Sequence, residues 1–66
     1  MDKYVLNDTD NVFSIIAYVT QAMRENGIGP RERNQYTIDA TSKDWEHLIT
    51  VSQNVIDRLN QATRIG

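Results

Sequence analysis

Two long stretches of the chain repeat apolar residues at helical spacing, and a short polar segment with two glycines separates them. At about 100° per residue, the apolar positions of the first stretch fall on one side of a helix, namely Val12, Phe13, Ile15, Ile16, Val19 and Met23. The polar cluster at residues 7–10 offers side chains that cap a helix start, and Asn26-Gly27 is typical of a helix end. The pattern predicts a helix over residues 9–26, with Phe13 and Met23 in its core.

The middle segment contains a helix-start signal of its own. Pro30 follows Gly29, and a proline in the first helical position sacrifices no hydrogen bond. A second helix over residues 30–40 is therefore expected, with Tyr36 and Ala40 on one face. The alternative is an extended segment at residues 36–38, because tyrosine and β-branched residues favour strands.

The second long stretch shows the most regular spacing in the chain. Its stripe of core positions alternates steps of three and four and consists of Trp45, Leu48, Ser52, Val55, Leu59 and Ala62. Ile49 and Ile56 widen the stripe on one flank, and Val51 widens it on the other. Thr41 and Asp44 match a capping box with aspartate in place of glutamate. These features predict a third helix over residues 42–63. Trp45 is interpreted as a core residue, with an interface anchor as the alternative.

Together these elements predict an all-α fold, a three-helix bundle in one domain over residues 1–66, with residues 1–8 as an N-terminal extension. The stripes of both long helices are about 160° wide, whereas a helix resting on one partner needs about 100°. Either the N-terminal residues 4–6 fold back over the surplus, or a second copy of the chain covers it. We favour a homodimer, and the interface candidates are Trp45, Ile15, Val19, Val51 and Val55.

Composition narrows the class of protein. The chain has 66 residues, a net charge of −2 and no cysteine, so disulfides and thiolate chemistry are excluded. Its negative charge argues against a protein that coats nucleic acid or anionic membranes. Neither a signal peptide nor a membrane-spanning run is evident, and the expected compartment is the cytoplasm.

Residues capable of catalysis or metal binding are few. His47 is the only histidine, lies on the polar face of the third helix, and is interpreted as a solvated surface residue. Asp44, Glu46 and His47 are too close in sequence to converge on one ion, and Asp44 already serves as a cap. We therefore expect no enzyme activity, no metal and no cofactor.

Three arginines surround the turn between the first two predicted helices, namely Arg24, Arg31 and Arg33. Free amides at a helix start and guanidinium groups are suited to bind an anion such as phosphate. Glu25 and Glu32 are interleaved, and no aromatic residues alternate with the arginines for base stacking. The leading hypothesis is thus a non-enzymatic interaction protein that binds itself or another protein. A small nucleic-acid-binding regulator that uses this turn is the alternative.

Residues 10–19 and Ala22-Met23 resemble the start of a group of very small bacterial and phage proteins, in which Asp-Gly-Asn-Ala-Phe-Ser precedes an apolar helix. The segments at residues 39–42, 44–45 and 47–49 are similar to the Ala-x-Ser-Gly-Asp-Tyr-x-x-Leu-Leu stretch of that group. This chain lacks a glycine after Asp10 and has Lys43 and Trp45 where the group has glycine and tyrosine. The resemblance implies a small helical accessory protein of phage or mobile elements, and it implies no site residues.

Overall fold

The first helix forms where both of its ends are capped. The computed structural model describes residues 3–63, and α1 (Val12–Glu25) begins after Asn11, whose side chain accepts a hydrogen bond from the Ser14 amide at 2.8 Å. The start is therefore later than predicted, and Asn11 provides the cap in place of the cluster at residues 7–10. At the other end, Gly27 has φ of +77°, and the Ile28 amide donates to the Met23 carbonyl. This Schellman motif confirms the predicted stop.

The second helix, α2 (Pro30–Ala40), has the predicted bounds. Residues 36–38 are helical, so the extended alternative is wrong. Tyr36 and Ala40 are its buried residues. The Tyr36 hydroxyl is 2.6 Å from the hydroxyl of Ser52, which is 0% exposed, and this hydrogen bond joins α2 to α3. Burial raises the pKa of Tyr36 above its usual value, and the bond to Ser52 lowers it by less.

The third helix, α3 (Trp45–Thr63), begins at a cap that differs from the predicted capping box. Asp44 itself accepts the His47 amide through its side chain at 3.0 Å and the Leu48 amide through its carbonyl. Thr41 instead ends α2, where its amide and hydroxyl donate to the Thr37 carbonyl. Because Thr41 is the C-cap of α2, it does not cap α3, which begins at Trp45, three residues later than predicted.

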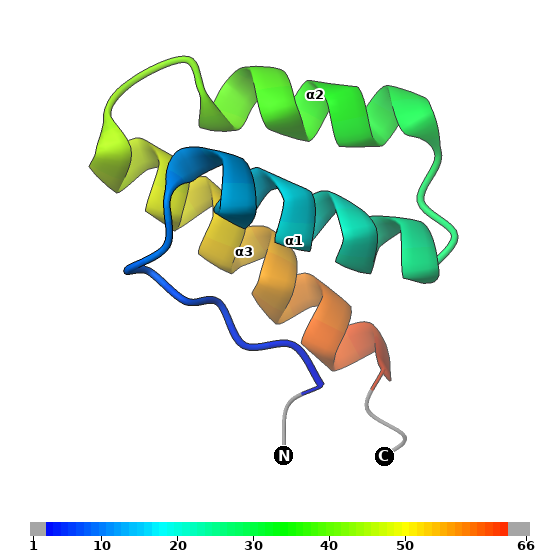
Figure 1. Ribbon diagram of the computed structural model, residues 1–66. Helices are drawn as coiled ribbons and strands as arrows, with labels where there is room; N and C mark the ends of the chain where they lie inside the picture. Colours follow the sequence, from blue (N-terminus) through cyan, green and yellow to red (C-terminus); the bar gives the residue numbers. More distant parts are fainter. Residues whose placement is uncertain (1–2, 64–66) are drawn as a thin grey trace.

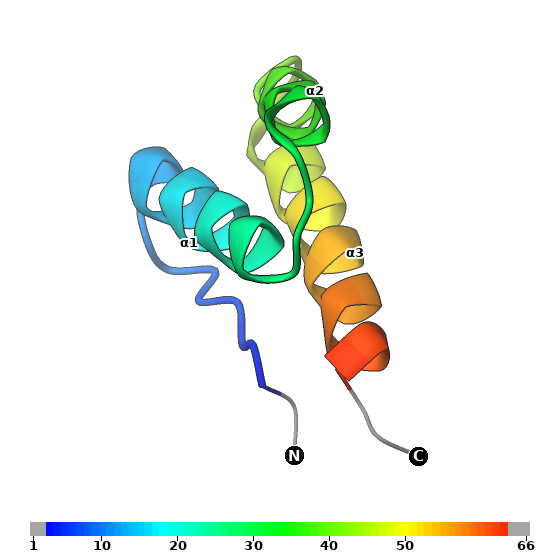
Figure 2. The same ribbon diagram turned by 90° about the vertical axis from the view of Figure 1, so that its right-hand side faces the viewer.

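The core side of α3 is rotated from the predicted stripe. Its buried residues are Leu48, Ser52, Ile56, Leu59 and Asn60. Val55, which the stripe placed at its centre, is half-buried, whereas the flanking Ile56 is 0% exposed. The reason is that α3 has a neighbour on each flank. It packs against α1 and α2, and all three helices are in mutual contact (Figures 1 and 2).

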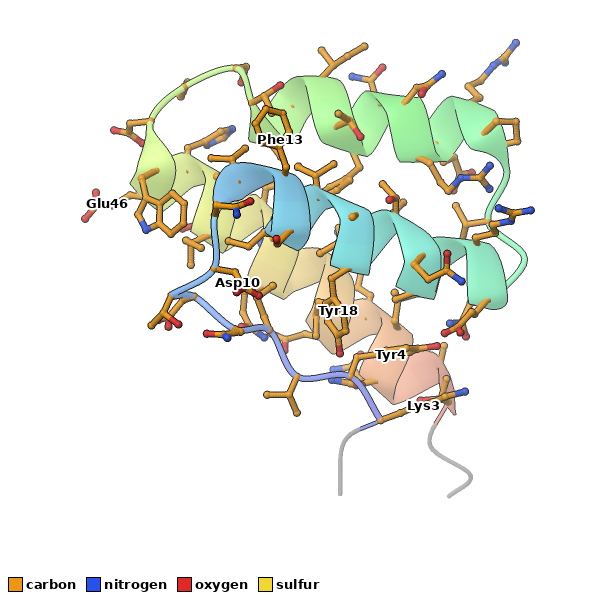
Figure 3. All side chains as sticks on the ribbon, viewed as in Figure 1. Lys3, Tyr4, Asp10, Phe13, Tyr18 and Glu46 are labelled. Carbon is orange, nitrogen blue, oxygen red and sulfur yellow. The ribbon has the colours of Figure 1, made fainter. Side chains whose placement is uncertain are left out.

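The N-terminal segment supplies the missing cover for α1 and α3. Residues 3–6, here called the strap, run along these helices on the side opposite α2 (Figures 1 and 2). The Tyr4 side chain is 6% exposed and belongs to the core, and its ring meets Tyr18 edge-on at 6.5 Å (Figure 3). Of the two sequence-based alternatives, the fold-back of residues 4–6 is therefore observed. A homodimer stays a prediction and needs a different surface.

Candidate protein-interaction surface

Large apolar side chains are exposed where α1 and α3 begin. Phe13 is 85% exposed, Trp45 is 43% exposed and Val12 is 37% exposed. In Figure 3 the Phe13 ring projects from the start of α1 on the side away from the strap. These three residues, here called the apolar end, form the candidate site.

A hollow of about 230 Å³ lies within the apolar end. Val12 and Trp45 form its walls, and the buried side chains Ala40 and Leu48 belong to its lining. Lys43 and Asp44 are also part of it, so the rim carries one charge of each sign. The arrangement therefore combines an apolar interior with a polar rim, which is typical of protein-binding surfaces.

Helix geometry explains why two predicted core residues are exposed. At 100° per residue, Phe13 is about 160° around α1 from Ile15, which is 1% exposed. Its assignment to the apolar side is therefore wrong. Trp45 is the first residue of α3, and side chains of a helix lean toward its N-terminus. The indole consequently extends beyond the end of the bundle, and it is only partly buried.

The other predicted interface residues lie elsewhere. Ile15 and Val19 are 1% and 0% exposed, because the chain's own core covers them, so they are not available to a partner. Val51 and Val55 are half-buried and line a second hollow of about 370 Å³ between α2 and α3. Of the five candidates, Trp45 alone belongs to the apolar end.

The three arginines at the α1–α2 turn differ in exposure and in their contacts. Arg24 and Arg31 are exposed. Arg33 is half-buried, and its guanidinium donates to the Ile28 carbonyl, so it braces the turn. The N-cap of α2 is Gly29, which has no side chain to cap the first turn. One of the three predicted anion contacts is thus already engaged within the chain.

His47 contacts another helix of the chain, whereas the sequence pattern was interpreted as that of a solvated surface residue. Its Nε2 lies 3.0 Å from the Asp39 carbonyl oxygen and 3.2 Å from a carboxylate oxygen of the same residue. Both atoms are acceptors, so Nε2 carries the hydrogen and links α3 to the end of α2. The sequence could not show this contact, because Asp39 lies on another helix. Among residues 3–63, no cluster of three or more His, Cys, Asp or Glu side chains is placed to hold a metal ion.

Two further observations bear on the class of protein. No helix in the described part of the chain is long and apolar enough to cross a membrane. Comparisons of the chain with known protein families, curated proteins and solved structures find no match. The resemblance to small accessory proteins of phage and mobile elements therefore stays a prediction, and the apolar end is interpreted from its own geometry.

Proposed function

We propose that this protein is a non-enzymatic helical interaction protein that binds a second copy of itself through the apolar end. The observation that carries the proposal is the exposure of Phe13, an aromatic residue that is 85% accessible and directly follows Val12, which lines the hollow together with Trp45. Exposed apolar groups that cluster and have a polar rim mark interaction sites. A core of this size is also often completed by association.

The rim supports a second copy as the partner. In a two-fold pairing, the same patch of both copies forms the interface. A rim with one positive and one negative charge can therefore be complementary to itself. A two-fold axis that brings Lys43 of one protomer to the partner's Asp44 forms the reverse contact at the same time. Burying the Phe13 ring contributes about 1.5–3 kcal/mol, which is roughly 10- to 100-fold in affinity.

The experiment is the absolute mass in solution, measured by light scattering behind a sizing column from micromolar to near-millimolar protein. We expect the mass to rise from 7.6 kDa toward about twice that value with concentration. Phe13→Ser should shift the association to at least about 10-fold higher concentration. The matched control is Ile38→Ser, because Ile38 is 63% exposed and lies on α2, outside the apolar end.

Circular dichroism checks that both variants keep the helical content of the natural chain. A mass of 7.6 kDa for the natural chain at every concentration refutes self-association through this surface. Equal effects of the Phe13 and Ile38 substitutions refute the apolar end as the contact.

A further inference from the structure

Only one asparagine of the chain precedes a glycine. In chain order, the asparagines are followed by aspartate, valine, glycine, glutamine, valine and glutamine, so this sequence occurs at Asn26-Gly27 alone. An asparagine side chain loses ammonia when the next backbone nitrogen attacks its carbonyl carbon, and glycine permits this close approach because it has no Cβ. Gly27 is exposed, and Asn26 is half-buried. Asn26-Gly27 therefore has the chemistry for deamidation.

The reaction needs no partner other than water. The Gly27 nitrogen forms a bond to Cγ of Asn26, the bond between Cγ and Nδ2 breaks, and Nδ2 leaves as ammonia with the proton of the Gly27 amide. Water then opens the cyclic imide at either of its two carbonyl carbons. The product at position 26 is an aspartate or its isomer, in which the main chain runs through the former side chain.

The folded end of α1 keeps the reacting atoms apart. The Gly27 amide donates to the Arg24 carbonyl at 3.1 Å, so it is already engaged. At ψ of 15° for Asn26, the Gly27 nitrogen nearly eclipses the backbone nitrogen of Asn26, whereas ring closure requires Cβ in that place. The asparagine is therefore protected as long as the last turn of α1 keeps this conformation.

The strap contributes to this protection through Tyr4. Nδ2 of Asn26 donates to the Tyr4 hydroxyl at 3.0 Å and to the Ala22 carbonyl at 2.8 Å. The same hydroxyl donates to the Glu25 carboxylate at 3.0 Å, so the strap contacts both the last residue of α1 and its C-cap. Tyr4 is held in turn by Asn60, whose side chain bonds its amide and its carbonyl at 2.9 Å each. Release of the strap therefore frees a helix end, where local opening requires the least free energy.

We propose that Asn26 is a deamidation site and that the strap controls the rate of its modification. The product holds the strap less tightly than asparagine does. A carboxylate at position 26 has no proton to donate to the Tyr4 hydroxyl or the Ala22 carbonyl, and it follows the carboxylate of Glu25 directly. The contacts of Asn26 with the strap are thus lost irreversibly once it has reacted. This inference does not depend on the proposed function.

The test compares Tyr4→Phe with Tyr36→Phe, because each chain loses one hydrogen-bonded phenol hydroxyl. Folded chains are incubated at mildly alkaline pH, and peptide mass spectrometry follows the loss of ammonia at each asparagine. We expect Tyr4→Phe to raise the rate at Asn26 about 2- to 10-fold, which is the effect of one hydrogen bond. Tyr36→Phe should leave this rate unchanged, because the Tyr36 hydroxyl bonds to Ser52 and not to the end of α1.

Two results overturn control by the strap. One is an unchanged rate in the Tyr4→Phe chain. The other is an acceleration by Tyr36→Phe as large as that by Tyr4→Phe, because Asn26 then reacts through unfolding of the whole chain.

Chains unfolded in urea provide the reference for the intrinsic reactivity. We expect Asn26 to react faster in urea than in the folded chain, and at the same rate in all three chains, since residues 25–27 are unchanged. Equal rates in the folded and unfolded natural chain overturn the protection. A rate at Asn26 no higher than at the other asparagines in urea overturns the site itself.

The consequence of the modification is tested with Asn26→Asp. The matched control is Asn34→Asp, because Asn34 is an exposed residue of α2. The chain with aspartate at position 26 should melt below the natural chain, and the control should melt close to it. Equal melting temperatures of the two variants overturn the weakening of the strap by the product.

Discussion

The substitution Asn60→Ala tests the energetic importance of the strap. In the natural chain, both polar atoms of this buried amide are bonded to the Tyr4 backbone at 2.9 Å. If the strap stays in place, two buried backbone groups lose their partner, at about 1–3 kcal/mol each. If the strap detaches, the Tyr4 ring becomes exposed, which costs about 1.5–3 kcal/mol. Because the chain takes the less costly route, the expected loss is about 1.5–3 kcal/mol in the free energy of unfolding.

This loss is large for a chain of this size. Stabilities of about 0.05–0.15 kcal/mol per residue correspond to about 3–10 kcal/mol for 66 residues. At about 4–8 °C per kcal/mol, the melting temperature should fall by about 6–24 °C. Circular dichroism during thermal and urea unfolding measures both quantities. The sizing experiment run at the same concentrations separates any effect on association from the effect on folding.

Asn54→Ala is the matched control, because Asn54 is an exposed asparagine of the same helix. Its expected effect is within about 0.5 kcal/mol. Asn60→Asp keeps the size of the side chain but replaces the donor that faces the Tyr4 carbonyl, and it should also destabilise. Equal melting temperatures for the Asn60→Ala and Asn54→Ala chains refute the importance of the amide pair.

Four further substitutions, one of them a control, probe the rest of the fold by urea unfolding. Tyr36→Phe should cost about 1–2 kcal/mol, because the Ser52 hydroxyl is left buried without a partner. The raised pKa of Tyr36 means that its contribution is complete below about pH 10 and is lost as the pH rises through and above that value. That part of the alkaline loss should disappear in Tyr36→Phe, and an identical profile contradicts the assignment. Gly27→Ala should cost about 1–2 kcal/mol because its φ is +77°, whereas Gly29→Ala has no such strain at φ of −72° and should cost about 0.5–1 kcal/mol as an N-cap change, and a larger loss at Gly29 than at Gly27 contradicts this. Asn11→Ala should cost about 1 kcal/mol by removing the cap of α1, and an unchanged midpoint argues against that cap.

The sequence predicted the helices well because their signals are local. The stop at Gly27 and the start at Pro30 depend on backbone conformations that one or two residues determine. The capping of α3 was assigned to the wrong residue, since Thr41 and Asp44 both suit a cap and only the path of the connection decides between them.

The candidate site was harder to predict because it depends on packing between elements. Trp45 was named from its type and position, but its partial exposure results from its place in the first turn of α3. Phe13 was missed because its place on the wheel was assigned to the core side. The strap contact between Tyr4 and Asn60 joins residues 56 positions apart, and no local sequence pattern reveals such a contact. It could be anticipated only as cover for an overly wide apolar face.

The hydroxyl pair of Tyr36 and Ser52 has a consequence for the uniqueness of the fold. Since α2 buries only Tyr36 and Ala40, apolar packing alone distinguishes poorly between neighbouring positions of this helix along α3. A shift by one residue separates the two hydroxyls and leaves both without partners in the interior. The bond thus ties the position of α2 along α3 to a directional contact, in addition to its two buried side chains. Loss of chemical-shift dispersion in α2 of the Tyr36→Phe chain, with helical content retained, is the expected result of losing that contact.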